Sequence, residues 1–255
     1  MAGRAAAALM YAALFSPVPA PEAGAAGAAQ APLPPPRPSN LTDHEAAADV
    51  AAPPPRPNDL GQPPSAPRPA QAAAVADESA CQERLRTLGV RFEPLAAIGN
   101  GACGASHPLK VSHLPDGLDL AAPATMVCPV AEALARWAKE VVLPEAARHL
   151  EAQPRRIAVG TSYECRNRNR QATGKLSEHA FANAVDISGF DFEKRKAVQI
   201  RDHAAETPEA LFQAAIRTQA CAYFTTVLGP GSDAAHADHL HLDLRGRSGG
   251  YRICQ

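Results

Sequence analysis

All six cysteines of this 255-residue chain lie in its C-terminal part, from Cys81 to the penultimate residue, Cys254. The other four are Cys103, Cys128, Cys165 and Cys221. An even number of cysteines in an exported chain favours disulfides, whereas reduced core thiols are the alternative. Because the chain has no C-x-x-C pair, a zinc site made of cysteines is not expected. We therefore expect three disulfides to staple one folded domain over residues 81–255, with their pairing left open.

The first 20 residues have the pattern of a signal peptide. Arg4 supplies a positive charge, residues 5–15 are apolar, and Val18-Pro19-Ala20 ends in a small residue that can precede cleavage. An alanine-rich start without a targeting role is the alternative. The apolar run is too short to cross a bilayer as a helix. We expect a periplasmic or secreted protein that has no stable membrane span after cleavage.

Residues 21–80 are rich in alanine and proline and contain no Phe, Tyr or Trp. Such a segment buries too little apolar surface to offset the entropy of ordering, so we expect a disordered linker. Two near-repeats, over residues 34–41 and 53–60, carry proline runs that favour an extended polyproline conformation. We interpret them as a semi-rigid tether, with a ligand for a proline-binding module as the alternative.

The expected fold is α+β, with a small, mostly antiparallel sheet and flanking helices. Helical spacing predicts helices over residues 82–88, 129–141 and 207–219, with Trp137 in the core and an interruption at Pro144. Strands are predicted over residues 156–163, 184–187 and 239–244. These elements do not alternate regularly, which argues against a parallel α/β sheet.

Charge gives no indication of a nucleic-acid partner. The formal net charge is −1, and a clustered basic excess is missing. Only Arg166, Arg168 and Arg170 form a local basic cluster, which is either a solvated loop or an anion-binding element.

The last predicted strand carries histidines on one face. Side chains alternate faces along a strand, so His239, His241 and Asp243 share one face while the intervening leucines share the other. The leucine face can pack on a core while the polar face lines a site. Asp243 can orient a histidine or pair with Arg245. His236, just upstream, is expected to be a loop residue, with a supporting position behind a ligand as the alternative.

A second segment supplies further ligands. His179 and Asp186, seven residues apart, can reach the same ion if a turn followed by a strand joins them, and His241 can be the third ligand. Nitrogen and carboxylate donors suit Zn²⁺, and three protein ligands leave one position for water. Hydrolysis also needs a base for the proton of that water. His239 and Asp238 are the two candidates.

The motif Ser-x-His-x-x-x-x-Ala-x-Asp over residues 177–186, followed by His-x-His over 239–241, resembles zinc peptidases. These include D-alanyl-D-alanine carboxypeptidases, lysostaphin-like enzymes and murein endopeptidases. More closely, residues 81–255 resemble the bacterial extensin-like C-terminal domain family. The stretches that carry this resemblance are 101–104, 124–129, 160–163, 175–179 and 229–233.

The resemblance implies a zinc-peptidase-like fold with His179, Asp186 and His241 as zinc ligands. In the murein endopeptidase branch, the histidine corresponding to His239 lies by the catalytic water. In the carboxypeptidase branch, the base is a glutamate at the position of Asp238. The peptidase pattern usually has glycine where Ala182 stands.

Those peptidases also place an arginine after a tyrosine near the scissile carbonyl. In Tyr163-Glu164-Cys165-Arg166 the arginine is displaced, and Arg166 is the best candidate for this role. It would hold a substrate carboxylate or the developing oxyanion. A surface or salt-bridged arginine is the alternative.

These expectations combine into an exported, monomeric zinc metallopeptidase that acts on peptidoglycan stem peptides or crosslinks. One alternative is a cell-wall binding or structural protein that keeps the fold without activity. Another is a zinc amidase or esterase acting on a different wall polymer. The sequence leaves open whether the bond joins D,D or L,D centres and whether cleavage is internal or terminal.

Overall fold

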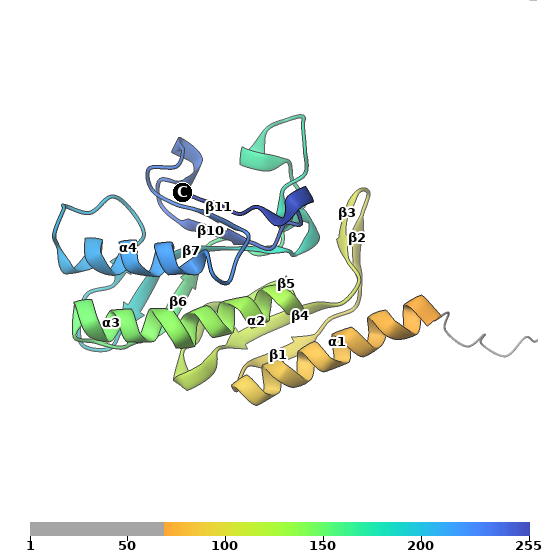
Figure 1. Cartoon of the computed structure of the whole chain (residues 1–255), viewed down its shortest axis with the longest axis horizontal. Helices are drawn as coiled ribbons and strands as arrows, with labels where there is room; N and C mark the ends of the chain where they lie inside the picture. Colours follow the sequence, from red (N-terminus) through yellow and green to blue (C-terminus); the bar gives the residue numbers. More distant parts are fainter. Residues whose placement is uncertain (1–68) are drawn as a thin grey trace, which may run out of the picture. The chain divides into compact units, whose positions relative to one another are not determined.

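The structure, a computed structural model, describes residues 69–255 (Figure 1). The expected signal peptide at 1–20, the linker up to residue 68 and the two proline-rich near-repeats lie outside the described residues. No helix in the described part of the chain is both long enough and apolar enough to span a membrane. The α-helices are α1 (Pro69–Leu88), α2 (Cys128–Trp137), α3 (Leu143–Leu150) and α4 (Pro208–Ala220).

One large sheet organises the domain. Its strands are β1 (Arg91–Pro94), β4 (Pro108–His113), β5 (Asp119–Val127), β6 (Pro154–Val159), β7 (Ala184–Phe192), β8 (Val198–Gln199), β9 (Thr226–Leu228), β10 (Leu240–Asp243) and β11 (Ile253–Cys254). The order is β1-β4-β5-β6-β7-β10-β9-β11, and β8 pairs with β7. Strands β2 (Ile98–Asn100) and β3 (Cys103–Ala105) form a separate hairpin.

The α+β class and the mostly antiparallel sheet are confirmed. Only the pairs β5–β6 and β9–β11 are parallel. The expectation of a small sheet is wrong, because the sheet has nine strands. Strands β8, β9 and β11 are only two or three residues long, which is too short to show a sequence period.

Helices cover one face of the sheet (Figure 1). The core on this face joins residues of α2 and α4 to the inward side chains of β7 and β10, including Leu240 and Leu242. Trp137 is fully buried, as expected, and its Nε1–H donates to the carbonyl oxygen of Ile216 over 3.0 Å. The alternation of leucine and histidine in β10 therefore turns the leucines toward this core.

Two predicted helix boundaries are wrong. Helix α1 begins at Pro69, so residues 69–80, expected in the linker, are helical; alanine, which is frequent there, is the best helix former. The chain also stays helical past Pro144. A π-helical turn, Ala138–Val142, joins α2 to α3, and Pro144 occupies the first turn of α3, where a missing N–H is tolerated.

Three disulfides close the domain, as expected. They join Cys81 to Cys128, Cys103 to Cys165 and Cys221 to Cys254, and no cysteine is free. The first fastens α1 to α2, the second fastens the β2–β3 hairpin to the loop after β6, and the third fastens the end of α4 to β11. Disulfides persist in oxidising compartments, so this covalent framework fits an exported protein.

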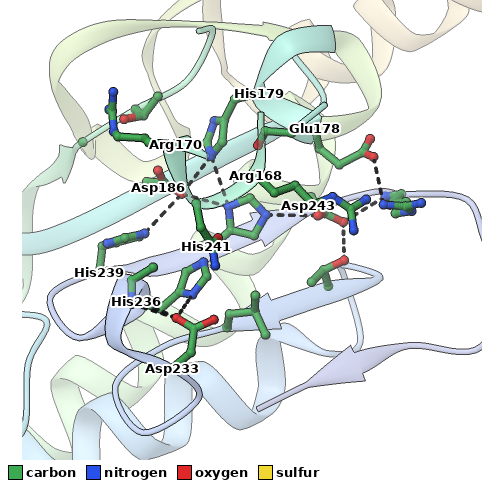
Figure 2. A pocket seen from close by; sticks show the side chains of 18 of the residues that line it. Arg168, Arg170, Glu178, His179, Asp186, Asp233, His236, His239, His241 and Asp243 are labelled. Atoms are coloured by element: carbon green, nitrogen blue, oxygen red, sulfur yellow. Dashed lines mark hydrogen bonds and ion pairs between the residues drawn. The ribbon is translucent and has the colours of Figure 1, made fainter. Parts of the chain in front are cut away.

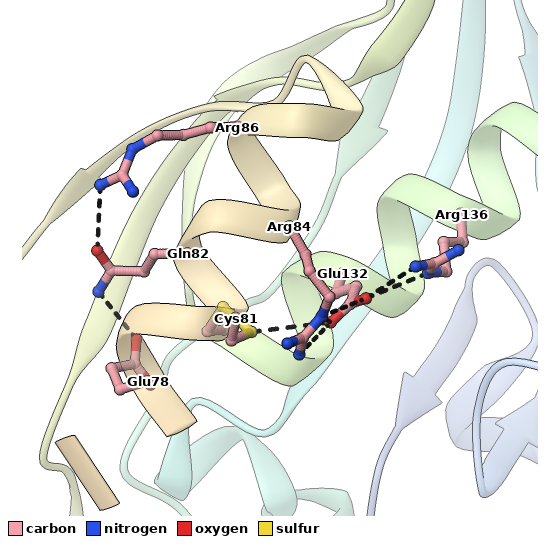
Figure 3. Close-up of a disulfide and its surroundings, with 8 residues drawn as sticks. Glu78, Cys81, Gln82, Arg84, Arg86, Glu132 and Arg136 are labelled. Atoms are coloured by element: carbon pink, nitrogen blue, oxygen red, sulfur yellow. Dashed lines mark hydrogen bonds and ion pairs between the residues drawn. A yellow bond between two sulfur atoms is a disulfide. The ribbon is translucent and has the colours of Figure 1, made fainter. Parts of the chain in front are cut away.

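An ion-pair cluster lies beside the first disulfide (Figure 3). The carboxylate of Glu132 accepts hydrogen bonds from Arg84 of α1 over 2.9–3.0 Å and from Arg136 over 3.1–3.2 Å. The hydrogen bond from Arg84, aided by Arg136, lowers the pKa of Glu132 even though burial opposes the shift. The contact between α1 and α2 therefore combines a covalent link with an exposed electrostatic one.

Breaking the first disulfide should destabilise the domain substantially. The bridge spans a sequence separation of 47 residues, and loop-closure entropy then predicts a loss of about 4 kcal/mol in the free energy of unfolding. The double variant Cys81→Ser/Cys128→Ser tests this by urea unfolding. Arg84→Ala, which removes only the ion pair across the same contact, is the matched control and should cost far less.

The oxidation state of the six cysteines separately tests the expected export. Protein taken from its native compartment should show no free thiol by mass spectrometry after alkylation without reductant. Alkylation of several of the six cysteines would contradict both export and the stapled domain.

Candidate metal centre

Three ligand atoms converge on the polar face of the sheet (Figure 2). His179 Nε2 lies 3.0 Å from Asp186 Oδ1 and 3.1 Å from His241 Nδ1, and His241 Nδ1 lies 3.0 Å from the same carboxylate oxygen. All three residues are buried, with exposed fractions of 0, 5 and 8%. The structure thus brings together the three residues that the sequence singles out as metal ligands; we call them the ligand trio.

Strand pairing and a tight turn position the ligand trio. In the antiparallel pair β7–β10, Asp186 and His241 are direct partners, so their side chains project together from one face. His179 comes from a 3₁₀ turn, Glu178–Phe181, that leads into β7. Ala182 closes this turn with φ 52° and ψ 24°, a left-handed conformation that favours glycine. Glycine is the residue that the peptidase pattern usually has there.

The remaining hydrogen bonds of the two histidines fix their tautomers. His179 Nδ1 lies 2.8 Å from the carbonyl oxygen of Ser162, which can only accept, so Nδ1 carries the hydrogen. His241 Nε2 lies 3.0 Å from Asp243 Oδ2 and donates to it in the same way. In their neutral forms both rings therefore turn a lone pair toward Asp186. Three acceptor atoms about 3 Å apart need a cation or a proton between them.

In the metal-free protein, a proton supplies this positive charge. Burial alone would lower the pKa of His241, but hydrogen bonds to Asp186 and Asp243 outweigh it and raise the pKa to about 9. Burial would raise the pKa of Asp186, yet its interactions with His179 and His241 bring it well below its usual range. A divalent ion can take the place of this proton, because the same lone pairs would face it.

The spacing fits a metal such as zinc. A tetrahedral zinc ion with bonds of about 2.0–2.1 Å holds its ligands about 3.3 Å apart, close to the distances within the ligand trio. The nitrogen and oxygen donors are also a set that zinc accepts. His179, Asp186 and His241 are the His/Asp group that can hold a metal in the described residues.

Asp243 holds His241 in place. Its Oδ2 accepts from His241, while its Oδ1 accepts from the hydroxyl of Thr226 and, over 3.0 Å, from the backbone N–H of Arg245. Such a carboxylate behind a histidine ligand fixes the ring orientation and raises its basicity. Of the two expected roles of Asp243, the structure shows the orienting one, and Arg245 contributes through its backbone.

His239 and Asp238 lie at the edge of the ligand trio. His239 precedes β10, and its Nε2 is 3.7 Å from Asp186 Oδ1. Its Nδ1 is 2.9 Å from Asp238 Oδ1, whose side chain is 87% exposed. The structure therefore places the His239 ring next to the ligand trio and Asp238 behind that ring. Which of them is the base stays a prediction.

The expectation that His236 is a loop residue away from the site is wrong. It is buried, with 7% exposure, and it belongs to the site instead of a free loop. Its ring packs against His239 and His241 at centroid distances of 5.2 and 5.7 Å, and its Nδ1 lies 2.6 Å from Asp233 Oδ1. Burial lowers the pKa of His236, although Asp233 opposes the shift.

A capping aspartate, Asp233, is the sequence signal that could have placed His236 in the site. Its carboxylate also accepts from the N–H groups of Ala235 and His236, so it caps the short helical turn Ala234–His236. An aspartate at a capping position, three residues before a histidine, places both side chains on one side of the turn.

Arg166 is paired with an acid. Its Nε donates to Glu164 Oε2 over 2.8 Å, and Arg170 donates to both oxygens of the same carboxylate over 2.6 and 2.9 Å. The salt-bridged alternative for Arg166 therefore has a geometric basis, although Arg166 also lines the site. A role of Arg166 toward substrate stays a prediction.

The ligand trio opens into a cleft of about 780 Å³. The cleft has two chemically different ends on either side of the trio (Figure 2). One end, which we call the histidine end, is lined by Asp233, His236, Asp238 and His239. The other, which we call the arginine end, contains Arg168, Glu178 and Asp243. Arg245 belongs to it because it lies 3.9 Å from Glu178, and Arg247 because it donates to Thr226, whose hydroxyl donates to Asp243.

The fold and the site define a disulfide-stapled α+β protein in which a buried histidine–aspartate trio can hold a metal in an open cleft. The family model described as Extensin-like protein C-terminus matches residues 79–255, most of the chain. The protein therefore belongs to this extensin-like family. Comparison with curated proteins gave no match, and neither did comparison with solved structures.

Proposed function

We propose that this protein is an exported zinc-dependent peptidase that hydrolyses peptide bonds of peptidoglycan. The observation that carries the proposal is the ligand trio, whose atoms His179 Nε2, Asp186 Oδ1 and His241 Nδ1 meet within 3.1 Å of one another at the base of a cleft. A structural site would close around its ion with four protein ligands. A trio open to solvent leaves room for water and substrate, as in catalytic zinc sites.

The covalent framework supports the substrate class. Three disulfides suit a protein that works outside the cytosol, where peptidoglycan is found. The resemblance of residues 177–186 and 239–241 to peptidases of the cell wall points to the same substrate. The cleft also offers polar groups on both sides of the trio, which suits an extended peptide with several hydrogen-bonding groups.

Zinc bound by His179, Asp186 and His241 would lower the pKa of a water molecule and polarise the scissile carbonyl. The rest of the chemistry falls to the protein. His239 donates its Nδ1–H to Asp238, so its Nε2 can accept a proton from the water and return it to the leaving amine. Asp243 keeps His241 in the tautomer that a ligand needs.

The proposal is tested by incubating the mature protein with zinc and purified muropeptides and measuring product masses. We expect two peptide fragments whose masses add up to the mass of the substrate plus one water molecule. The reaction should stop after treatment with a zinc chelator and resume when zinc is restored. If wall material binds but no fragment forms under any of these conditions, the protein is a binding protein and the peptidase proposal fails.

Zinc affinity should rise with pH up to about 9. His241 is protonated below its raised pKa of about 9 in the metal-free protein, and a metal ligand must be deprotonated. Binding therefore displaces one proton at neutral pH, and the apparent affinity should rise about tenfold per pH unit between pH 6.5 and 8.5. An unperturbed histidine would level off near its reference pKa of about 6.5.

Competition with a chelator of known affinity measures this slope. Calorimetry in two buffers of different ionisation enthalpy counts the released proton independently. An affinity that does not change between about pH 7 and 8.5 would contradict the raised pKa of His241.

A further inference from the structure

We propose that the arginine end of the cleft is a carboxylate-binding subsite, formed by Arg168, Arg245 and Arg247, that selects substrates carrying a carboxylate near the scissile bond. The inference rests on the proposed function for the identity of the substrate as a peptide. Its structural basis is separate, since it depends on charges outside the ligand trio.

The cationic groups at this end lack the acidic partners that other arginines of the cleft have. Arg166 and Arg170 share the carboxylate of Glu164. Within residues 69–255, by contrast, Arg168 and Arg247 form no ion pair, and Arg245 has only a long contact of 3.9 Å with Glu178. The arginine loop over 166–170 therefore has two members that share one carboxylate. Its third member, Arg168, has no acidic partner among residues 69–255, and its Nε donates only to the carbonyl oxygen of Leu176 over 3.4 Å.

Arg247 is held rigidly for this role. One of its terminal nitrogens donates to the carbonyl oxygen of Thr225 over 2.9 Å, and the other donates to the hydroxyl of Thr226 over 2.6 Å. The guanidinium also lies over the ring of Tyr251, 5.5 Å from its centroid. Two of its five N–H groups are thus used, and the others stay available. A guanidinium fixed in advance loses little entropy when it binds a carboxylate.

The acids at the arginine end are already engaged. Asp243 accepts from His241, from the hydroxyl of Thr226 and from the backbone of Arg245. Glu178 Oε2 accepts from Asn183 over 2.8 Å. These carboxylates have structural partners, while three guanidinium groups line the same end of the cleft. The three guanidinium groups outnumber the two carboxylates, so the local electrostatic field favours an anion, and arginine forks match a planar carboxylate.

The second disulfide supports this arrangement. Cys165 lies within the loop that carries Arg168, and its bridge to Cys103 fastens this loop to the β2–β3 hairpin. Backbone hydrogen bonds from Ser177 to Arg166 and from Arg168 to Lys175 close the loop on itself. Arg168 therefore projects from an anchored loop toward the side of the ligand trio where Glu178 and Asp243 lie (Figure 2).

The carboxylate can come from two sources. It is either the free terminal carboxylate of a peptide, which would make the enzyme a carboxypeptidase, or a carboxylate on a residue inside a peptide, which would allow internal cleavage. The three guanidinium groups recognise the same chemistry in both cases. The distinction requires peptides that differ only in where the charge lies.

Binding to the metal-free protein tests the subsite without hydrolysis. The probes are N-acetyl-alanyl-alanine, its terminal amide, and an amidated peptide with one internal glutamate, each titrated by calorimetry. At least one carboxylate probe should bind more tightly than the amide. Arg247→Ala and Arg168→Ala should each weaken that binding about 10- to 100-fold, as expected for a charged hydrogen bond. The probe that responds identifies the source.

Matched controls keep the result interpretable. Arg155→Ala removes an exposed arginine outside the cleft and should leave binding unchanged. Arg247→Lys keeps the charge without the fork and should recover only part of the affinity. Equal affinities of wild type, Arg168→Ala and Arg247→Ala for every carboxylate probe would overturn the subsite. Arginine-dependent binding without any muropeptide cleavage would instead refute the peptidase and leave the subsite intact.

Discussion

The His241→Ala variant should lose zinc binding altogether, while the wild-type protein binds about one zinc per chain, as a three-ligand site does. His241 Nδ1 lies 3.0 and 3.1 Å from the other two ligand atoms, so its removal opens one side of the ligand trio. Two remaining ligands do not hold zinc against dialysis. Elemental analysis of the dialysed protein gives the stoichiometry, and His179→Ala should give the same result.

The matched control for this experiment is Asp243→Asn. The substitution keeps all three ligands and replaces the carboxylate that accepts from His241 Nε2, from the Thr226 hydroxyl and from the Arg245 backbone N–H. Loss of such a partner costs about 10- to 100-fold in metal affinity, so this variant should still bind zinc at high concentration. Full zinc occupancy in His179→Ala or His241→Ala would show that the trio does not hold the metal. A thermal melt of each metal-free variant separates loss of ligand from loss of fold.

The fold could be predicted where periodicity was long enough to read. The alternation through His239–Leu244 gave the faces of β10 correctly, and the segment starting at Thr207 gave α4, whose Ala210 N–H is capped by the Thr207 hydroxyl. Strands β9 and β11 escaped prediction because three and two residues carry no period. Disulfide pairing also depends on which elements become neighbours, and this is a property of the tertiary structure.

The candidate site, like the fold, could be predicted only as far as local sequence features determine it. The three members of the ligand trio could be named from residue type and spacing, because each lies in a short motif. Their convergence depends on the pairing of β7 with β10, in which Asp186 and His241 are partners. The capping Asp233 could have indicated that His236 lies on the same side of a turn. The burial of His236 could not be predicted, since it results from packing against the rings of His239 and His241.

The trio also bears on the choice between an enzyme and a binding protein. With both histidines neutral, three acceptor atoms meet in a buried site, which destabilises the fold unless a cation or a proton lies between them. This destabilisation is offset if the site binds a catalytic cation. The residues beside the ligand trio are then the candidates for the other catalytic groups.

His239→Ala should lower the rate of muropeptide cleavage by about 10²- to 10⁴-fold, the usual worth of a general base, while zinc binding stays largely intact. The ring of His239 is next to the ligand trio, with Nε2 3.7 Å from Asp186 Oδ1, yet it is not one of the three converging ligands. Its exposed side faces the cleft. The loss should therefore fall on kcat, measured with zinc at saturation.

Asp238→Ala separates the two candidate bases. If His239 is the base, Asp238 acts through its 2.9 Å contact with His239 Nδ1, and its removal should cost far less than removal of the ring. Because the Asp238 side chain is 87% exposed, water can replace that contact. Should Asp238→Ala instead abolish cleavage while His239→Ala keeps it, the carboxypeptidase-like base is the correct one. If neither substitution changes an already negligible rate while wall binding persists, the protein is a binder and the cleft serves recognition alone.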